Sequence, residues 1–285
     1  MPELPEVETI RRQLAPLVEG RRLEQVEILD ARWSRPLSPR KLAGALQGRR
    51  VEELGRRGKY LVWNLEGDVH LAQHLRMTGT VLAGADPEPP HTRVRIDLGQ
   101  GRRLVVVDPR RFGTGELLPG SDALQAFFAA RLGLEPFDER FTAKHLRGLA
   151  RGRTAPIKAL LLDQRKIAGV GNIYADEALF RAGIHPLRPA RRLTPAQHVR
   201  LRQTVIEALA AGIDARGASI DDFRHIDGVR GSFQNEFLVH RREGEACGKC
   251  GTAIVKMVVS GRGTYVCETC QPRPRRQRKR VREMR

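Results

Sequence analysis

Four cysteines in two close pairs are the residues of this 285-residue sequence with the clearest chemistry. Cys247 and Cys250 form one pair, and sixteen residues further on Cys267 and Cys270 form the other. This spacing is typical of four thiolates around one tetrahedral zinc ion, with each pair on a turn and a β-hairpin between the pairs. Two disulfides are the alternative, but they suit a cytosolic chain with no other cysteine poorly. We expect one structural zinc, because four protein ligands leave no coordination position for a substrate.

The N-terminal dipeptide Pro2-Glu3 offers a different chemistry. Once Met1 is removed, Pro2 presents a secondary amine that can attack an aldehyde-like carbon and form a charged iminium, which is an electron sink. The amine attacks only when it is unprotonated, so its surroundings must lower its pKa. Glu3 beside it can carry protons. A proline near a terminus is more commonly the start of a loop, so the dipeptide alone does not decide between the two interpretations.

Five further motifs occur in order along the chain. They are MPELPEVET at 1–9, GKYL at 58–61, HLRMTG at 74–79, DPRRFG at 108–113 and GVGNIYADE at 169–177. Together with the cysteines they closely resemble the bacterial formamidopyrimidine-DNA glycosylases, the 8-oxoguanine DNA glycosylase/AP lyase family. The resemblance runs from residue 1 to about residue 271 and leaves out only the Arg-rich tail. The PELPE start favours this branch over the related endonuclease VIII-like enzymes, which act mainly on oxidised pyrimidines.

The resemblance implies roles at the reaction itself. Pro2 matches the family nucleophile, which attacks C1′ of the damaged nucleotide, and Glu3 matches the acid that protonates the sugar. Lys59 matches the lysine that assists base release and strand cleavage, although outside this motif it would be interpreted as an ordinary surface lysine. Arg262 joins this catalytic set from the zinc hairpin. Glu6 belongs to the same acidic helix start, where a structural role is at least as well supported.

Base excision from a duplex requires the target nucleotide to leave the stack, and side chains must fill the hole that remains. Met77, Arg110 and Phe112 match the filling residues of the family. Met adapts its shape, Phe stacks, and Arg can hydrogen-bond the partner base left behind. Met77 in a core and Phe112 as an apolar anchor after a turn are the plainer interpretations.

Phosphate binding is the remaining task. Asn172 follows Gly-Val-Gly at a predicted helix start, where free backbone N–H groups favour an anion. Arg262 lies at the tip of the predicted zinc hairpin, within reach of a phosphate. Lys158, one helix earlier, either contributes to the same phosphate binding or is simply solvated. The resemblance adds further DNA contacts at His74, His91 and Arg153. Residues 217–233 correspond to the mobile lesion-recognition loop of the family.

The elements that must position these residues change in character along the chain. Apolar residues at helical spacing predict a helix after Pro5, which Pro16 should kink or end. Period-two segments at 23–28, 60–65, 94–98 and 104–107 predict a mainly antiparallel β-sandwich or barrel over residues 20–118. Helices are then predicted at 121–131, 142–151, 155–164, 172–182 and 194–215, the last with Thr194 as N-cap and Pro195 at the first position.

The predicted fold class is therefore α+β, with an N-terminal helix plus an antiparallel β-sandwich, a helical domain and a C-terminal zinc-finger β-hairpin. We divide the chain into a catalytic β-sandwich domain at 1–120, a helix–two-turns–helix DNA-binding domain at 121–235, a four-cysteine zinc finger at 236–271 and a basic, disordered tail at 272–285.

The charge of the chain points to a polyanion as partner. The net charge is +18, and the tail contributes eight basic residues against one acid, so residues 1–271 are basic on their own account. This distribution favours nucleic acid over a membrane surface. No apolar run approaches the roughly 18–20 residues of a membrane span, and the acidic N-terminus shows no secretory signal. We expect a cytoplasmic, nucleoid-associated bacterial protein that acts as a monomer.

These observations lead to one functional hypothesis and two rivals. The hypothesis is a bifunctional glycosylase and AP lyase that excises oxidised purines from duplex DNA through a Pro2 Schiff base and β,δ-elimination, with no catalytic metal or organic cofactor. A non-catalytic, zinc-containing DNA clamp is one rival, which has no need of Pro2, Glu3 and Lys59 together. A pyrimidine-preferring, endonuclease VIII-like glycosylase is the other.

Overall fold

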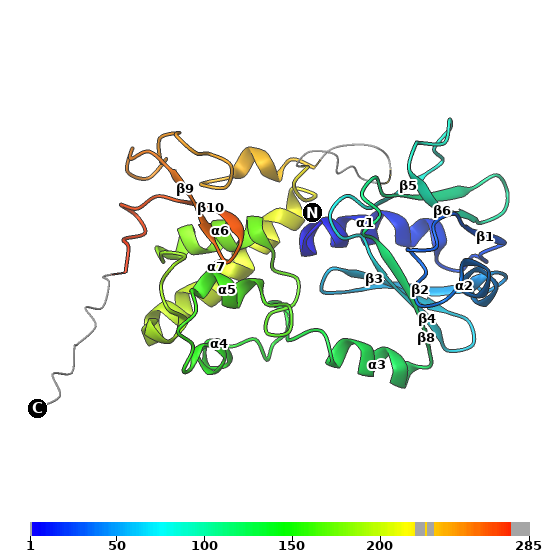
Figure 1. Ribbon diagram of the computed structural model, residues 1–285, viewed down its shortest axis with the longest axis horizontal. Coiled ribbons are helices and arrows are strands. Elements are labelled where there is room, and N and C mark those ends of the chain that lie inside the picture. Colours follow the sequence, from blue (N-terminus) through cyan, green and yellow to red (C-terminus); the bar gives the residue numbers. More distant parts are fainter. Residues whose placement is uncertain (1, 220–225, 227–230, 275–285) are drawn as a thin grey trace, which may run out of the picture.

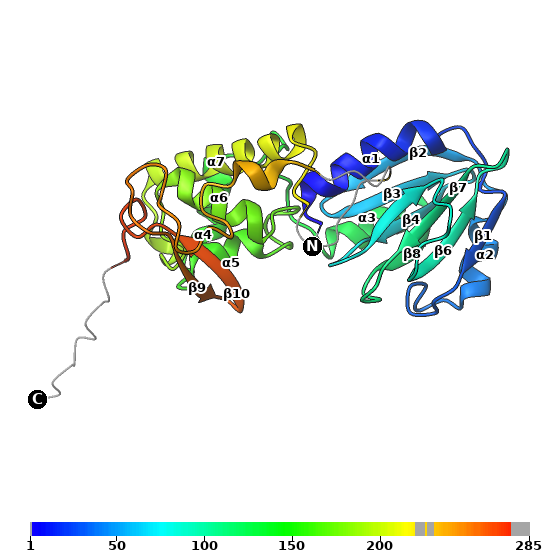
Figure 2. The same cartoon turned by 90° about the horizontal axis from the view of Figure 1, so that it is seen from above.

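The computed structural model describes residues 2–219, 226 and 231–274. Two bodies lie side by side, and the N-terminal end of the chain lies between them (Figures 1 and 2). The predicted α+β class is confirmed, with antiparallel sheets in one body and helices in the other. In the described part of the chain, no helix is long and apolar enough to cross a membrane. Most of the predicted lesion-recognition loop and residues 275–285 of the predicted tail lie outside the described residues.

The first body is an antiparallel sandwich with one long helix. Its elements are α1 (Leu4–Val18), β1 (Gln25–Ile28), α2 (Pro39–Leu46), β2 (Val51–Arg57), β3 (Tyr60–Leu65), β4 (Val69–His74), β5 (Thr80–Ala83), β6 (Thr92–Asp97), β7 (Arg103–Val107) and β8 (Thr114–Pro119). The strands form two four-stranded sheets in the orders β1-β6-β7-β5 and β2-β3-β4-β8. The chain therefore folds as a sandwich and not as the barrel that the sequence also allowed.

The second body is helical and carries a small hairpin. The elements that follow the sandwich strands are α3 (Ser121–Ala129), α4 (Ala143–Ala150), α5 (Ile157–Leu162), α6 (Asn172–Ala182), η1 (Ala190–Arg192), α7 (Pro195–Asp214), η2 (Phe233–Glu236), β9 (Val255–Val259) and β10 (Arg262–Val266). All five predicted helices are present. The predicted cap is also confirmed, since the Thr194 hydroxyl accepts the Gln197 N–H at 3.2 Å and Pro195 is the first helical residue.

Helix α1 joins the two bodies. Val7, Ile10 and Leu14 are fully buried in the core of the sandwich, whereas Leu4, one turn earlier, packs into the core of the helical body. Pro16 lies inside the helix, which ends two residues later at Val18. The N-terminal end of α1 is thus held by both cores, and the residues that precede it are fixed relative to each.

Helix α3 packs on the sandwich and not on the helical body. Phe127 is 6% exposed and its ring meets the Tyr60 ring edge-on at 5.7 Å. The domain boundary predicted after residue 120 places this helix with the helices that follow it, and the division into four domains remains a prediction. The apolar periodicity predicted a helix here but not its packing partner, because an apolar face alone does not show which core the helix packs against.

The hairpin β9–β10 differs from its prediction by a small shift. The turn consists of Ser260 and Gly261, both at positive φ, and Arg262 is the first residue of β10, opposite Val259. A two-residue turn with positive φ at both positions matches the twist of the flanking strands. Arg262 therefore lies beside the tip, and strand pairing fixes its backbone.

Candidate active site

A cavity of about 390 Å³ lies where the two bodies meet, at the N-terminal end of α1. The sandwich and the helical body both contribute walls. Predicted site residues that line the cavity are Glu3, Lys59, His74, Met77, Asn172 and Arg262. Pro2 is buried next to Glu3. The structure therefore gathers at one place residues from almost the whole length of the chain.

The Glu3 carboxylate lies at the N-terminal end of α6. Its Oε1 accepts the backbone N–H of Ile173 at 3.0 Å, and the side chain is only 2% exposed. Free N–H groups and the positive end of the helix dipole stabilise a carboxylate at such a position. Helix α6 thus fixes the Glu3 side chain beside Pro2, although α1 and α6 are far apart in the sequence.

The Gly-Val-Gly sequence before α6 has a steric purpose. A Cβ on Gly171 would lie 2.1 Å from the Glu3 Cδ, and a Cβ on Gly169 would lie 2.4 Å from Leu4 Cδ1. Gly169 also adopts a φ of +91°, which disfavours any side chain. Both glycines are therefore required for the close approach of α1, and the Gly169 carbonyl accepts the Leu4 N–H at 3.1 Å.

Glu6 supports the same end of α1 from within the fold. Its Oε2 accepts the Glu3 N–H at 2.8 Å, and its Oε1 accepts the Tyr174 hydroxyl at 2.7 Å and the Ala218 N–H at 2.7 Å. Burial raises the Glu6 pKa, and the nearby Glu3 carboxylate raises it further. Because three donors are already committed to Glu6, the geometry favours the structural role.

Lys59 presents a buried amine to the cavity. The residue is 5% exposed, and within the described ranges its Nζ makes no hydrogen bond or ion pair. Burial lowers the Lys59 pKa below its usual value; the nearby Glu3 and Glu6 carboxylates oppose this shift, and the positive charge of Arg262 adds to it. An amine that is desolvated and unpaired is available to a ligand that enters the cavity.

The turn that carries Lys59 is fixed by the segment that links the two bodies. Glu135 accepts the Gly58 N–H at 2.5 Å and both terminal nitrogens of Arg56 at 3.0 Å. The Arg56 Nε in turn donates to Glu8 Oε2 at 2.9 Å. One guanidinium therefore joins α1, the β2–β3 turn and the linker, and sequence reasoning missed Glu135 because 77 residues separate it from Gly58.

His74 lies at the end of β4, opposite Tyr60 in the register of the sheet. Its Nδ1 accepts the Arg76 N–H at 2.9 Å. Burial lowers the His74 pKa to about 3, and the positive charges of Arg76 and Lys59 lower it as well. The imidazole is therefore neutral at physiological pH, so its Nε2 carries the proton and can donate it in a hydrogen bond.

Asp108 ties together the two loops that hold the predicted filling residues. Its carboxylate accepts the Thr78 hydroxyl at 2.6 Å and the Gly113 N–H at 2.7 Å. Met77 is 36% exposed and Phe112 is 49% exposed, so both project from a rigidly held base. The Arg110 guanidinium carbon lies 5.0 Å from the centre of the Phe112 ring. Neither Arg110 nor Phe112 lines the cavity itself.

Asn172 connects the cavity to the zinc hairpin. Its Nδ2 donates to the Gly263 carbonyl at 2.9 Å, and its buried Oδ1 has no partner among the described residues. Arg262 precedes Gly263 and is exposed at the cavity wall. The amide and the guanidinium therefore face the same space from two elements.

The structure corrects the position expected for Lys158. Its side chain is fully buried, and its Nζ donates to Asp176 Oδ1 at 2.6 Å and to the Thr264 hydroxyl at 2.7 Å. Burial lowers the Lys158 pKa, which the Asp176 carboxylate opposes. The amine is enclosed between α5, α6 and β10 and anchors the hairpin, so Lys158 is not solvated, and its contact with a phosphate remains a prediction.

The two remaining predicted DNA contacts lie outside the cavity. His91 is exposed at a φ of +68°, and its carbonyl accepts the Asp108 N–H at 3.1 Å, so it lies beside the Arg110 loop. Arg153 is half-buried after α4, where its Nε donates to the Leu149 carbonyl at 2.7 Å.

The four cysteine sulfurs fit one zinc ion. They all lie within 4.8 Å of one another, and the Cys250–Cys267 and Cys247–Cys270 pairs are 3.4 and 3.9 Å apart. Zinc–sulfur bonds of about 2.3 Å place tetrahedral sulfurs about 3.8 Å apart. No disulfide joins them. The site holds one structural zinc, and the buried Cys247 and Cys267 also pack with Phe180 and Val239.

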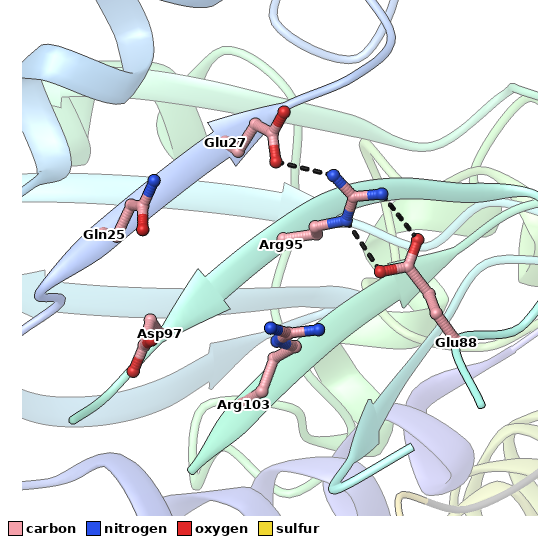
Figure 3. A pocket seen from close by; sticks show the side chains of 6 residues that line it. All are labelled: Gln25, Glu27, Glu88, Arg95, Asp97 and Arg103. Carbon is pink, nitrogen blue, oxygen red and sulfur yellow. Dashed lines mark hydrogen bonds and ion pairs between the residues drawn. The ribbon is translucent and has the colours of Figure 1, made fainter. Parts of the chain in front are cut away.

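A smaller charged hollow of about 240 Å³ lies on the outer face of the sandwich (Figure 3). Arg95 lies there between Glu27 and Glu88, with nitrogen–oxygen distances of 2.7 Å to each carboxylate (Figure 3). None of the predicted site residues lines this hollow. The Arg95 charge is balanced by these two carboxylates, and we assign the hollow no part in the chemistry.

Comparison with known proteins covers almost the whole chain. Residues 1–115 match the formamidopyrimidine-DNA glycosylase N-terminal domain, residues 132–224 match the H2TH domain of the same enzymes, and residues 244–273 match a zinc finger found in FPG and IleRS. The formamidopyrimidine-DNA glycosylase of Thermus thermophilus is 48% identical over 275 residues, which are 95% of this chain and 98% of the relative. That of Chloroflexus aggregans is 46% identical with the same coverage.

Solved structures agree with these relatives. The crystal structure of the MutM (Fpg) protein from Thermus thermophilus matches with a TM-score of 0.85 and 46% identity, over 95% of this chain and 98% of that chain. A complex between the Lactococcus lactis Fpg and DNA containing an abasic site matches with a TM-score of 0.89 and 36% identity, over 95% and 100%. The non-catalytic clamp and the endonuclease VIII-like glycosylase are not favoured by these matches.

Proposed function

This chain belongs to the formamidopyrimidine-DNA glycosylase family, as a DNA glycosylase and AP lyase of base excision repair, and we propose that it excises oxidised purines through the amine of Pro2. The cavity at the start of α1 is the main support for the catalytic roles that we assign. Glu3, Lys59, Asn172 and Arg262 all line it, immediately beside Pro2. A protein that only binds DNA needs no buried carboxylate and unpaired amine at this position.

The first step uses the pair at the start of the chain. With Met1 removed, the Pro2 nitrogen attacks C1′, the glycosidic bond breaks, and its electron pair leaves with the base. The Glu3 carboxylate, held by the N-terminal end of α6, takes the proton from the Pro2 amine and passes it to the sugar oxygen as the ring opens. The product is an iminium that joins Pro2 to C1′.

The following steps use the iminium as an electron sink. Loss of a C2′ proton to a base expels the 3′ phosphate, and a second elimination expels the 5′ phosphate. Lys59 is the amine best placed to assist, because its Nζ is desolvated and faces the cavity unpaired. It donates a proton or a hydrogen bond to the leaving base and then to a leaving phosphate oxygen.

The remaining predicted residues hold an opened duplex. Met77, Arg110 and Phe112 project from loops that Asp108 joins, and we assign them to the space that the extruded nucleotide vacates. The phosphate contacts, which orient the enzyme without reading sequence, are assigned to Asn172, Arg262, His74, His91 and Arg153. The partner is double-stranded DNA with oxidised purines or abasic sites, bound by a monomer at the bacterial nucleoid. Complexes of Lactococcus lactis Fpg with Fapy-dG containing and abasic DNA support this assignment.

The test is borohydride trapping on a duplex with one 8-oxoguanine opposite cytosine, with an oxidised-pyrimidine duplex in parallel. We expect a covalent adduct on the first duplex that maps to Pro2, and Pro2→Gly should abolish efficient turnover while binding to an abasic duplex persists. An adduct on the pyrimidine duplex alone would contradict the purine preference. If the chain binds both duplexes but forms no adduct with either, the non-catalytic DNA clamp would be the better interpretation.

A further inference from the structure

A basic groove lies on the helical body, away from the cavity described above. It has a volume of about 660 Å³, and one wall is α4 and the other is η1 with the start of α7. Its charged walls carry Lys144, Arg147, Arg151 and Arg191, and His198 also lines it. We call these five residues and the space between them the α4 groove.

The α4 groove contains cations and no carboxylate. All four lysine and arginine side chains are exposed, and none of them makes an ion pair with any residue in the described ranges. The hollow on the sandwich in Figure 3 is different, because Arg95 there is neutralised by Glu27 and Glu88. Uncompensated positive charge in a concave surface raises the local concentration of a polyanion.

The local sequence builds this surface. Lys144, Arg147 and Arg151 are three and four residues apart, so they project from one face of α4 and its C-terminal end. The Thr142 hydroxyl caps this helix by accepting the His145 N–H at 3.1 Å. Gly148 leaves the wall open between the cations, since a Cβ there would meet no atom within 4 Å.

The floor of the groove holds an uncommitted polar atom. His198 is 3% exposed, and its Nδ1 donates to the Thr194 carbonyl at 2.9 Å. Its buried Nε2 has no partner among the described residues. A buried polar atom without a partner costs free energy unless a ligand or water satisfies it. A ring that donates through Nδ1 accepts through Nε2, so this atom takes a water or another donor and not a phosphate oxygen.

We propose that the α4 groove binds the sugar-phosphate backbone of the duplex that flanks the lesion. The inference rests on the proposed function, because it takes duplex DNA as the partner of the cavity. Arg153, a predicted DNA contact, lies next to the groove, since the Arg191 N–H donates to the Arg153 carbonyl at 3.0 Å. Phosphates that lie beyond the reach of the cavity residues are therefore bound by a second row of cations, and the enzyme holds longer duplexes more tightly.

Duplex length is the variable that tests this proposal. Affinity is measured for central abasic-site duplexes from about 10 to about 40 base pairs, at several salt concentrations. The full chain is compared with the variant Lys144→Gln/Arg147→Gln/Arg151→Gln. A matched control also removes three exposed charges, but from the sandwich and away from both the cavity and the groove; it is Arg40→Gln/Lys41→Gln/Arg102→Gln.

We expect the groove variant to bind the shortest duplex as the unaltered chain does, and to lose about tenfold or more on the longest. The slope of log affinity against log salt on long DNA should fall by about two to three, because each phosphate contact contributes about 0.9. Retention of the full gain with length would overturn the proposal, as would an equal loss in the control. Excision from the shortest duplex, measured on the same samples, tests the proposed function separately because the groove plays no part in it.

Discussion

Two buried lysines in this molecule have opposite surroundings. Lys59 is 5% exposed at the cavity, and its amine has no ion pair among the described residues. Lys158 is fully buried between the helices and the zinc hairpin, and its amine lies 2.6 Å from the Asp176 carboxylate. His240 donates to the other oxygen of Asp176 at 2.9 Å, so three elements meet at one carboxylate. Burial lowers the pKa of both lysines, but only Lys158 has a hydrogen-bonded carboxylate that compensates for it.

The difference fits the proposed roles, in which Lys59 takes part in the chemistry and Lys158 stabilises the structure. A buried charge without a partner costs stability, and a protein retains it where the reaction needs it. A buried pair resists removal of one partner, because the other is left uncompensated. The sandwich side of the cavity therefore carries a desolvated amine without a hydrogen-bonded partner, and the helical side carries the scaffold that orients Arg262 and Asn172.

Lys59→Met should separate these roles most strongly. We expect kcat for excision to fall about 10²- to 10⁴-fold, the range that a positioned proton donor contributes. The melting temperature should stay equal or rise near neutral pH, because the variant removes a desolvated amine that binds its proton more tightly in the unfolded chain. Single-turnover excision and thermal unfolding of the same preparation measure both. A large fall in melting temperature would show that Lys59 is structural after all.

Lys158→Met should give the opposite pattern. The substitution leaves Asp176 buried with an uncompensated charge, so we expect a loss of about 3–5 kcal/mol in the free energy of unfolding. Urea unfolding measures the loss, and excision at low temperature should persist in the fraction that remains folded. In that background, Asp176→Asn should recover part of the stability by removing the charge. If Lys158→Met is as stable as the unaltered chain, the pair is not what anchors the hairpin.

The two lysines also show how far the sequence could predict the fold and the site. The motif around Lys59 predicted a catalytic role, which remains a prediction although the residue does line the cavity with Glu3. Spacing alone predicted the zinc ligands and the helices. Lys158 was predicted in a phosphate grip or in solvent, because its partner Asp176 lies 18 residues away on another helix and its enclosure depends on Thr264 in the hairpin. Periodicity reports which face of an element is apolar, but not which distant group will neutralise a charge on it.

The sandwich side of the cavity should also respond to acid. The His74 pKa is lowered to about 3 in the fold, against about 6.5 when unfolded, so the unfolded chain binds more protons between these values. The free energy of unfolding therefore falls as pH falls through this window, by about 2 kcal/mol from His74 at pH 5. His74→Asn keeps an acceptor for the Arg76 N–H and should flatten this pH dependence. Urea unfolding between pH 7 and 5 measures it, and an unchanged slope would place the acid sensitivity elsewhere.

The smallest expected effect concerns how the linker holds Lys59 in position. Glu135→Gln keeps an acceptor for the Gly58 N–H but weakens the ion pair with Arg56, so the β2–β3 turn should loosen without unfolding. We expect kcat to fall about tenfold, which corresponds to about 1.4 kcal/mol, while KM for a lesion duplex stays within about twofold.

Asp138→Asn is the matched control for this prediction. It removes a carboxylate from the same linker, but the ion-pair partner of that carboxylate is the exposed Arg140. Combining Glu135→Gln with Lys59→Met distinguishes positioning from bulk stability. If Glu135 acts through Lys59, the double variant should be no slower than Lys59→Met alone, since the group being positioned is already gone. If the double variant instead loses kcat by the product of the two single losses, the linker network stabilises the whole sandwich and does not act through Lys59. The two lysines would then differ only in their part in the reaction.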